Sequence, residues 1–185
     1  NVHPGSAKRC MINAQLIAME FHGMLPVHDR PEATEGYEGF SHLCAMQGEV
    51  ELATLEYIIR DHDRASFEAR KALFESAAAF LNAKYGAGTV EVALRDSYYN
   101  MREKIEPHMA IVEAAQQAMR DAGVTPRVVP IRGGTDGARL SYEGLPCPNL
   151  FTGGENYHGR FEYVPVEDME AAVRTLKYIL RNAAK

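Results

Sequence analysis

The residues with the clearest chemical potential lie in a glycine-rich stretch near the end of the sequence. Residues 149–162 place His158 in a loop without helical or strand periodicity, where its imidazole can face a ligand. Zinc takes three or four protein ligands, and no second histidine or carboxylate pair lies beside His158. His158 is therefore either a zinc ligand whose co-ligands come from elsewhere, or a surface histidine that caps a nearby carbonyl. Glu162 either orients this histidine or is an exposed strand carboxylate.

A second loop, residues 131–137, presents polar groups on exposed backbone. Its sequence Arg132-Gly-Gly-Thr-Asp136 can offer backbone N–H groups and a hydroxyl to an anionic or carbonyl oxygen, as oxyanion sites do. The alternative is a plain Gly-Gly turn capped by Thr135 or Asp136 at the start of a helix. The two loops flank one short apolar run, and loops that converge at strand ends usually frame a pocket.

Three further polar residues are candidates for substrate contacts. Asn100 and Arg102 follow a predicted strand with one residue between them, so both side chains are expected on one face, where they can hold an amide carbonyl and a carboxylate. Arg102 can equally form an ion pair with a nearby glutamate. His3, before Pro4, is either a turn residue or a third member of this set.

Composition and charge exclude several classes of function. The net charge is −5 and no block of Lys and Arg marks a phosphate-binding surface, so nucleic acid and membranes are not expected partners. The three cysteines are widely spaced, which argues against a disulfide framework and favours a reducing cytoplasm. The hydrophobic content of 46% is enough for a buried core. No apolar run approaches the roughly 20 residues that span a bilayer.

Periodicity in the first hundred residues predicts the element order α-β-β-α-β. The predicted elements are a helix over 7–24 capped by Ser6, strands over 39–46 and 50–61 flanking Gln47-Gly48-Glu49, a helix over 65–85 that ends at Gly86, and a half-buried strand over 90–94. The rest of the sequence predicts alternating helices and strands. These are helices over 109–122, 135–143 and 166–184, and short strands over 127–130, 150–151 and 161–164. Such alternation is typical of one part of a doubly wound α/β layer.

Six ordered blocks resemble the peptidase T family, tripeptide aminopeptidases among the dinuclear-zinc exopeptidases. The blocks are residues 1–5 (Asn-Val-His-Pro-Gly), 34–40 (Thr-Glu-Gly-Tyr-Glu-Gly-Phe), 57–61 (Tyr-Ile-Ile-Arg-Asp), 96–104 (Asp-Ser-Tyr-Tyr-Asn-Met-Arg-Glu-Lys), 130–137 (Pro-Ile-Arg-Gly-Gly-Thr-Asp-Gly) and 144–154 (Gly-Leu-Pro-Cys-Pro-Asn-Leu-Phe-Thr-Gly-Gly).

The resemblance implies an α/β protein with two domains. Residues 1–104 would form an α+β lid that mediates homodimerisation and lacks its first strand, and residues 105–185 the last portion of the zinc-peptidase catalytic domain. By the same resemblance His158 would be a zinc ligand. The residues that bind the peptide substrate would be His3, Asn100, Arg102, Arg132, Thr135 and Asp136.

The family's remaining zinc ligands and its general-base glutamate would precede Asn1, so the sequence predicts a piece of a two-zinc enzyme that is inactive alone and carries no catalytic residue of its own. Two other possibilities remain open. One is a non-catalytic lid, dimerisation and substrate-binding module. The other is a free-standing peptide- or anion-binding protein that uses Arg102 and the Gly-Gly loop, which a start codon directly before Asn1 would favour.

Overall fold

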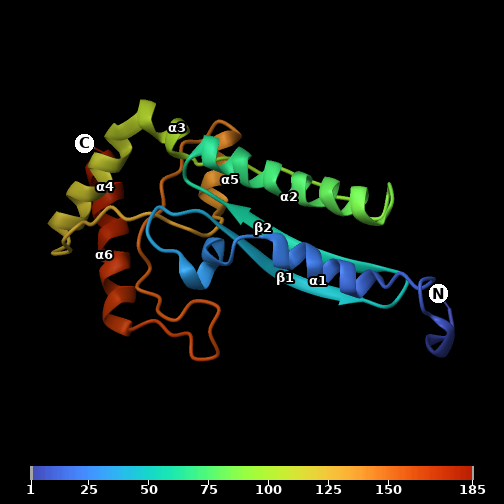
Figure 1. The fold of residues 1–185 in the computed structure, drawn as a ribbon. Helices are drawn as coiled ribbons and strands as arrows, with labels where there is room; N and C mark the ends of the chain where they lie inside the picture. Colours follow the sequence, from blue (N-terminus) through green and yellow to red (C-terminus); the bar gives the residue numbers. More distant parts are fainter. Residues whose placement is uncertain (1, 185) are drawn as a thin grey trace. The chain divides into compact units, whose positions relative to one another are not determined.

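The chain folds into two compact units (Figure 1). The computed structural model describes residues 2–184. The N-terminal unit comprises the residues up to Asn100 together with Pro130–Gly133, and the C-terminal unit comprises Met101–Val129 and the residues from Gly134 onward. The mixture of helices and strands confirms the predicted α/β class. No helix within residues 2–184 is both long enough and apolar enough to cross a membrane.

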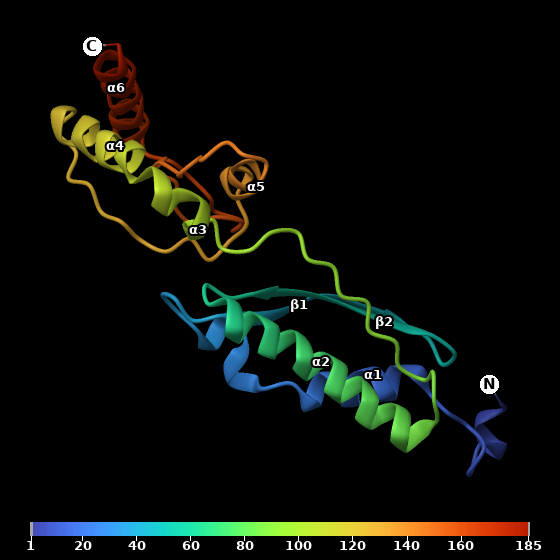
Figure 2. The same cartoon turned by 90° about the horizontal axis from the view of Figure 1, so that it is seen from above.

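The N-terminal unit consists of a β-hairpin with two helices on one face (Figure 2). Its main elements are α1 (Ala14–Met24), β1 (Phe40–Gly48), β2 (Ala53–Arg60) and α2 (Arg64–Tyr85), with three short 3-10 helices, η1 (Pro4–Ser6), η2 (Val27–Asp29) and η3 (Pro31–Ala33). The two strands pair antiparallel from Phe40–Arg60 to Gly48–Ala53, with a bulge at Cys44. The predicted hairpin is confirmed, but its turn lies between Gly48 and Ala53 and is closed by Glu49 N–H donating to Leu52 O at 2.8 Å.

Side-chain caps set the helix boundaries. The predicted start of the first helix near Ala7 is wrong, because the Asn13 side chain accepts from Gln15 N at 3.0 Å and caps α1 there. The second helix is confirmed to within one residue. Asp63 caps it by accepting from Ser66 N at 2.7 Å, and it ends at Gly86, whose φ of 117° favours glycine.

An aromatic cluster joins both helices to the sheet. The Tyr57 ring of β2 meets the Phe74 ring of α2 edge-on at 5.0 Å and the Phe21 ring of α1 at 6.5 Å, and the two phenylalanine rings are 5.9 Å apart. Ile17, Leu25, Ala77, Ala78 and Leu81 complete the buried core. Burial raises the pKa of Tyr57 to about 12.

The predicted strand over residues 90–94 is wrong. The segment is extended but carries no strand or bridge pairing, although Val90 and Val92 pack against the core as the alternation predicted. A strand needs a partner at hydrogen-bonding distance, and within residues 2–184 this segment has none.

The C-terminal unit is mostly helical. Its elements are α3 (Arg102–Ile105), η4 (Glu106–His108), α4 (Met109–Asp121), α5 (Asp136–Tyr142) and α6 (Val166–Ala183). Helices α4 and α6 pack together, and Asn182 Nδ2 donates to Asp121 Oδ2 at 3.0 Å. The three predicted helices are confirmed within one or two residues at each end.

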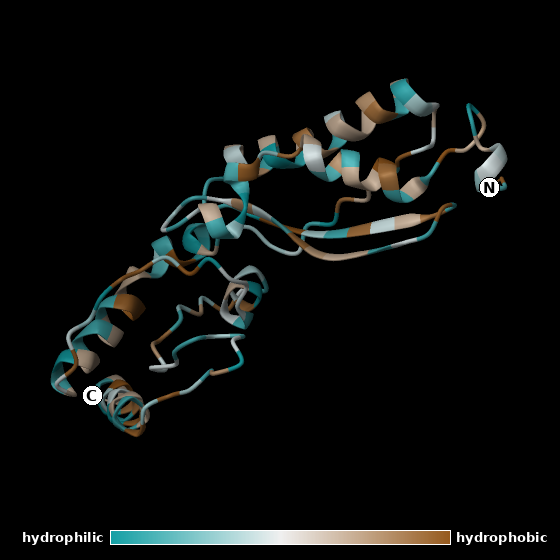
Figure 3. Cartoon of the chain, turned by 60° about the horizontal axis from the view of Figure 1, so that its bottom comes forward, coloured by the Kyte–Doolittle hydropathy of each residue, from teal (hydrophilic) through white to brown (hydrophobic). Residues whose placement is uncertain are grey.

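The strands predicted in this unit are wrong. Residues 127–130, 150–151 and 161–164 form no strand, and the described part of the unit holds one isolated antiparallel bridge, between Glu155 and Tyr163. Figure 3 shows hydrophobic residues on α6, and several of its hydrophobic side chains are half exposed or more. They include Met169, Val173, Leu176 and Leu180. For the three segments wrongly predicted as strands, the local sequence pattern indicated apolar, extended chain. Whether such chain pairs into a sheet depends on residues far away in the sequence.

The aromatic cluster makes a test of the core. Replacing Phe74, which is 4% exposed, with Ala should lower the free energy of unfolding by about 3–5 kcal/mol, because it removes a buried ring and leaves a cavity. Phe80→Ala on the same helix is the matched control, since that side chain is 57% exposed and its loss should cost much less. Urea unfolding followed by far-UV circular dichroism measures both. Equal effects of the two substitutions would contradict the described core.

Candidate functional site

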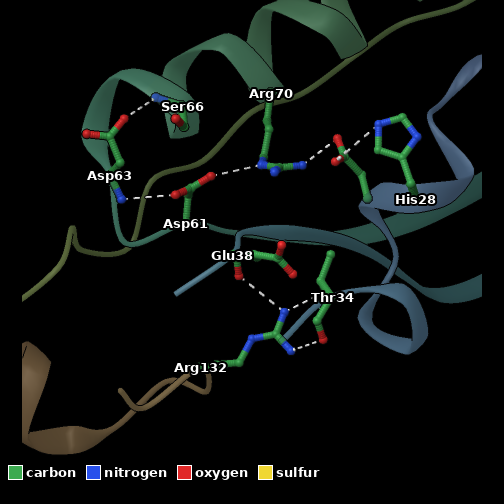
Figure 4. Close-up of polar contacts among 9 residues, drawn as sticks. His28, Thr34, Glu38, Asp61, Asp63, Ser66, Arg70 and Arg132 are labelled. Carbon is green, nitrogen blue, oxygen red and sulfur yellow. Dashed lines mark hydrogen bonds and ion pairs between the residues drawn. The ribbon is translucent and has the colours of Figure 1, made fainter. Parts of the chain in front are cut away.

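Arg132 is held inside the N-terminal unit although it lies far along the chain (Figure 4). Its guanidinium donates to Thr34 O at 2.6 Å, to Thr34 Oγ1 at 2.5 Å and to Glu38 O at 3.2 Å. It also lies over the Phe40 ring at 4.9 Å from the centroid. Three oxygens of the loop before β1 are thus satisfied by one side chain, which orders that loop.

A polar corner forms where β2 meets α2, and it brings together two of the predicted site residues. Asn100 Nδ2 donates to His62 O at 3.1 Å, and the Tyr37 ring meets the His62 ring edge-on at 5.1 Å. Burial lowers the pKa of His62 from its ordinary value of 6.5; the carboxylate of Asp61 opposes this shift and the positive charge of Arg132 adds to it. Arg132 and Asn100 therefore both act on His62.

An ion-pair brace supports this corner. Arg70 of α2 pairs with Asp61 at 2.9 Å and with Asp29, and Asp61 Oδ1 also accepts from Asp63 N at 2.9 Å (Figure 4). The Asp61 side chain is 5% exposed, and these partners satisfy its oxygens. A side chain at Gly39 would collide with the Asp61 carboxylate, which explains the glycine there.

Thr135 and Asp136 lie at the start of α5. Thr135 caps this helix by accepting from Ala138 N at 3.2 Å and also accepts from Asn149 Nδ2 at 3.3 Å. Asp136 is the first helical residue and is exposed to solvent. Gly137 packs so tightly against Cys147 O that a Cβ would lie 2.6 Å from it. The structure therefore contains the helix cap that was the alternative prediction for this loop. The Asp136 carboxylate remains exposed to solvent.

His158 lies at the tip of a narrow loop in the C-terminal unit. The Glu155–Tyr163 bridge closes the loop with hydrogen bonds of 2.9 and 3.2 Å. The backbone of His158 has a φ of 62°, which is uncommon for a residue with a side chain, and its N–H donates to Glu162 Oε2 at 3.0 Å. Within residues 2–184 its exposed imidazole makes no hydrogen bond or ion pair, so both ring nitrogens are available to a ligand.

The other two predicted residues make contacts within their own turns. His3 is exposed, and its Nδ1 accepts from Gly5 N at 3.0 Å within its own turn. Arg102 begins α3 in the C-terminal unit, and its Nε donates to Glu106 at 2.6 Å. The expectation that Asn100 and Arg102 project from one strand face is wrong, because the backbone turns into a helix between them.

No group of three or more His, Cys, Asp or Glu side chains is arranged to hold a metal ion in the part of the chain that is described. Within residues 2–184, His158 offers an exposed imidazole without a hydrogen bond, of the kind that zinc prefers, as do His42 and His108. Sequence reasoning missed His62 and Tyr37. Their signal was present, because His62 directly follows the block 57–61 and Tyr37 lies between Gly36 and Gly39 in the block 34–40.

Comparison with known proteins assigns the chain to a family of peptidases. It belongs to the peptidase family M20/M25/M40, whose sequence profile matches residues 6–182.

Two relatives within that family illustrate the similarity. The chain is 59% identical over all 185 residues to "Peptidase T" of Clostridium perfringens strain SM101 and 56% identical to "Peptidase T" of Shouchella clausii, covering 46% and 45% of their lengths. A crystal structure of aminopeptidase PepT from Bacillus cereus has the same fold, with a TM-score of 0.63 and 20% identity over the whole chain and 49% of that protein. The chain therefore spans about half the length of these relatives.

Substitution of Arg132 tests whether its side chain orders the loop at residues 34–40. Arg132→Ala should leave the carbonyl and hydroxyl of half-buried Thr34 and the carbonyl of exposed Glu38 without their donor, and should lower the free energy of unfolding by about 1.5–3 kcal/mol. Amide exchange in residues 34–40 should become faster. Arg139→Ala is the control, because its ion pair with Glu143 is exposed on both sides and should contribute less than about 1 kcal/mol. Unchanged exchange in the loop would contradict the tethering role.

The lowered pKa of His62 predicts how the stability of the fold depends on pH. Its folded-state pKa lies below 6.5, so the unfolded chain binds the proton first as the pH falls. The contribution of His62 to stability should be complete above the unfolded pKa and should be lost as the pH falls through the folded-state pKa. NMR titration of the His62 ring should give a midpoint below 6.5, and Arg132→Gln should raise it. A midpoint at or above 6.5 would refute the described burial.

Proposed function

We propose that this chain is part of a zinc-dependent aminopeptidase that releases the N-terminal residue from tripeptides and so takes part in the breakdown of peptides. The observation that supports it is the 59% identity to Peptidase T of Clostridium perfringens along the entire chain. In this proposal residues 1–104 are most of a lid and residues 105–185 the last portion of the catalytic domain. The parent protein acts in the cytoplasm, which suits its three free cysteines.

His158 is the proposed zinc ligand. Its left-handed backbone and its N–H bond to Glu162 hold it at the loop tip, which leaves the imidazole free for a metal. Bound zinc polarises a peptide carbonyl and activates water. Because affinity requires several ligands acting together, His158 by itself binds zinc weakly, and the two-zinc centre needs ligands from the rest of the parent protein.

The proposed substrate-binding residues divide into three that are exposed and three that are half-buried. His3, Arg102 and Asp136 are exposed and can contact the termini or backbone of a peptide. Asn100, Arg132 and Thr135 are held by bonds to the protein. Arg132 and Asn100 thereby shape the His62 corner, and Thr135 fixes the start of α5 beside Asp136.

A narrower function is proposed for the 185 residues taken alone: a lid, dimerisation and substrate-binding module. The observation that favours it is the separate core of the N-terminal unit, which needs no contribution from a metal centre. Among the residues that the structure describes, no strand pairs with the outer edge of β1, and such an edge suits pairing with a second copy.

Complementation tests the aminopeptidase proposal. Tripeptide hydrolysis with added zinc should be absent for this chain alone and present after mixing with a separately expressed piece of Clostridium perfringens Peptidase T that supplies the unmatched part. His158→Ala should lower that activity at least 100-fold and reduce the zinc retained after dialysis, measured by elemental analysis. His108→Ala, an exposed histidine of η4, is the matched control and should change neither.

The same two substitutions at the corresponding positions of the intact Clostridium perfringens enzyme give an independent readout if the pieces do not associate. Activity in the 185-residue chain alone, tightly held zinc in that chain, or full activity without His158 would each overturn the assignment.

A further inference from the structure

The loop that carries His158 contains a tyrosine whose side chain folds back onto the start of the loop. The Tyr157 hydroxyl lies within hydrogen-bonding distance of Thr152 Oγ1, at 2.8 Å. The same threonine oxygen accepts from Gly154 N at 3.4 Å. The residue directly before His158 is therefore joined to the segment that enters the loop through one threonine hydroxyl.

Gly154 packs against the Tyr157 ring. A Cβ at this position would lie 2.6 Å from the ring atoms Cε1 and Cζ and 2.5 Å from the hydroxyl oxygen, which is closer than real side chains approach. Gly154 is not among the glycines with a positive φ, so the contact with the ring, rather than the backbone conformation, explains the glycine. Gly154 and Tyr157 therefore form one packing unit.

The neighbouring Gly153 fixes the same segment to α6. Its φ of 78° favours glycine, and a Cβ there would collide with the Cβ of Asp168 in the first turn of α6. Helix α6 in turn packs against α4. Through Tyr157, the tip of the loop is thus held to a segment that lies directly against a helix of the same unit.

Tyr157 stands between two residues whose backbone is left-handed. Asn156 has a φ of 56° and His158 a φ of 62°. Such conformations cost free energy in residues with a side chain and persist only where the surroundings determine them. The bond from His158 N to Glu162 holds the later half of the loop, and Gly159 N donates to Asn156 O at 2.8 Å. The tyrosine provides the corresponding hold on the earlier half.

We propose that Tyr157 is a positioning residue for His158, with Thr152 and Gly154 as the seat of its side chain. It holds the His158 backbone in the left-handed conformation and so limits the directions that the imidazole can take. This inference rests on the proposed role of His158 as a zinc ligand and deepens it. Contacts that orient a metal ligand from outside the ligand set typically change metal affinity 10- to 100-fold when they are removed.

A direct contact with the substrate is the less suitable role for Tyr157. Its side chain is 59% exposed, but the hydroxyl is engaged by Thr152 and the ring by Gly154. The two roles differ in what they change. Loss of a substrate contact raises KM and leaves the loop as ordered as before, whereas loss of a positioning residue loosens the loop in the absence of substrate and metal.

NMR relaxation of the 185-residue chain without zinc measures the order of the loop. The backbone order parameter of His158 should be about 0.85 in the parent chain and below about 0.6 in Tyr157→Ala. Tyr157→Phe and Thr152→Val should each lower it by a smaller amount, and together no further than either does alone, because they remove the same hydrogen bond. Thr152→Ser keeps the hydroxyl and should behave as the parent does. Tyr163→Phe, at an exposed tyrosine of the same loop, is the matched control.

Gly154→Ala tests the seat of the ring. The added methyl group should displace the Tyr157 ring and lower the order parameter of His158 as far as Tyr157→Ala does. In the Tyr157→Ala background the same substitution should change nothing further, since no ring remains for the methyl group to meet. An equal effect of Gly154→Ala with and without the ring would overturn the proposal.

Zinc affinity gives the second readout, in a full-length protein in which this chain replaces the matched 46% of the Clostridium perfringens enzyme. Competition with a chelator should show zinc binding about tenfold weaker in Tyr157→Ala and unchanged in Tyr163→Phe. His158→Ala in the same protein tests the proposed function separately. If it leaves zinc binding unchanged, the zinc role of His158 is wrong and this inference falls with it.

A different outcome would refute the positioning role alone. If His158→Ala abolishes tight zinc binding while Tyr157→Ala leaves either the loop order or the zinc affinity unchanged, the proposed function stands and Tyr157 does not position the histidine. Unchanged loop order together with a raised KM for a tripeptide would make Tyr157 a substrate contact instead.

Discussion

The N-terminal unit depends on the contact between the Tyr57 ring and the two phenylalanine rings below it. Tyr57 is the point at which β2, α1 and α2 meet, and its hydroxyl connects this apolar cluster to polar groups at the surface. The hydroxyl lies 2.8 Å from His22 Nδ1, and Arg30 lies 3.0 Å from the other ring nitrogen. A guanidinium can only donate, so His22 Nε2 accepts the hydrogen bond from Arg30. The other ring nitrogen, Nδ1, then carries the hydrogen and donates to the Tyr57 hydroxyl oxygen. The core and the loop after α1 are therefore linked by one chain of oriented hydrogen bonds.

Local sequence determined the helices but not the pairing of strands. Asp63 and Gly86 lie next to the residues they cap, so the limits of α2 could be predicted from a short window. The alternation at Val90 and Val92 correctly predicted which side chains face the core, yet the segment lacks a strand beside it and remains unpaired. Whether an extended segment becomes a strand depends on distant partners, and a short window contains no information about them.

In the candidate site, too, contacts between neighbouring residues could be predicted from the sequence and contacts between distant residues could not. Thr135 was correctly recognised as a possible helix cap because the residues it serves are adjacent. The loop Arg132–Asp136 was expected to offer backbone N–H groups and a hydroxyl to a substrate oxygen, and nothing in the sequence indicated that the Arg132 side chain donates to the loop at residues 34–38, nearly a hundred positions away. The strand-based argument for Arg102 failed because a helix begins there, which its ion pair with Glu106 one turn later stabilises. His62 became visible only once Asn100, Tyr37 and Arg132 were located around it.

The four residues Pro130–Gly133 make the N-terminal unit discontinuous in sequence. A gene truncated after Asn100 would encode every helix and strand of that unit and still omit Arg132, so the carbonyls of Thr34 and Glu38 would lose their shared donor. Boundaries chosen from secondary structure alone would thus produce a shortened protein with a frayed loop at residues 34–40. A protein in which a short engineered linker replaces residues 101–129 and joins Asn100 to Pro130–Gly133 would preserve the natural unit.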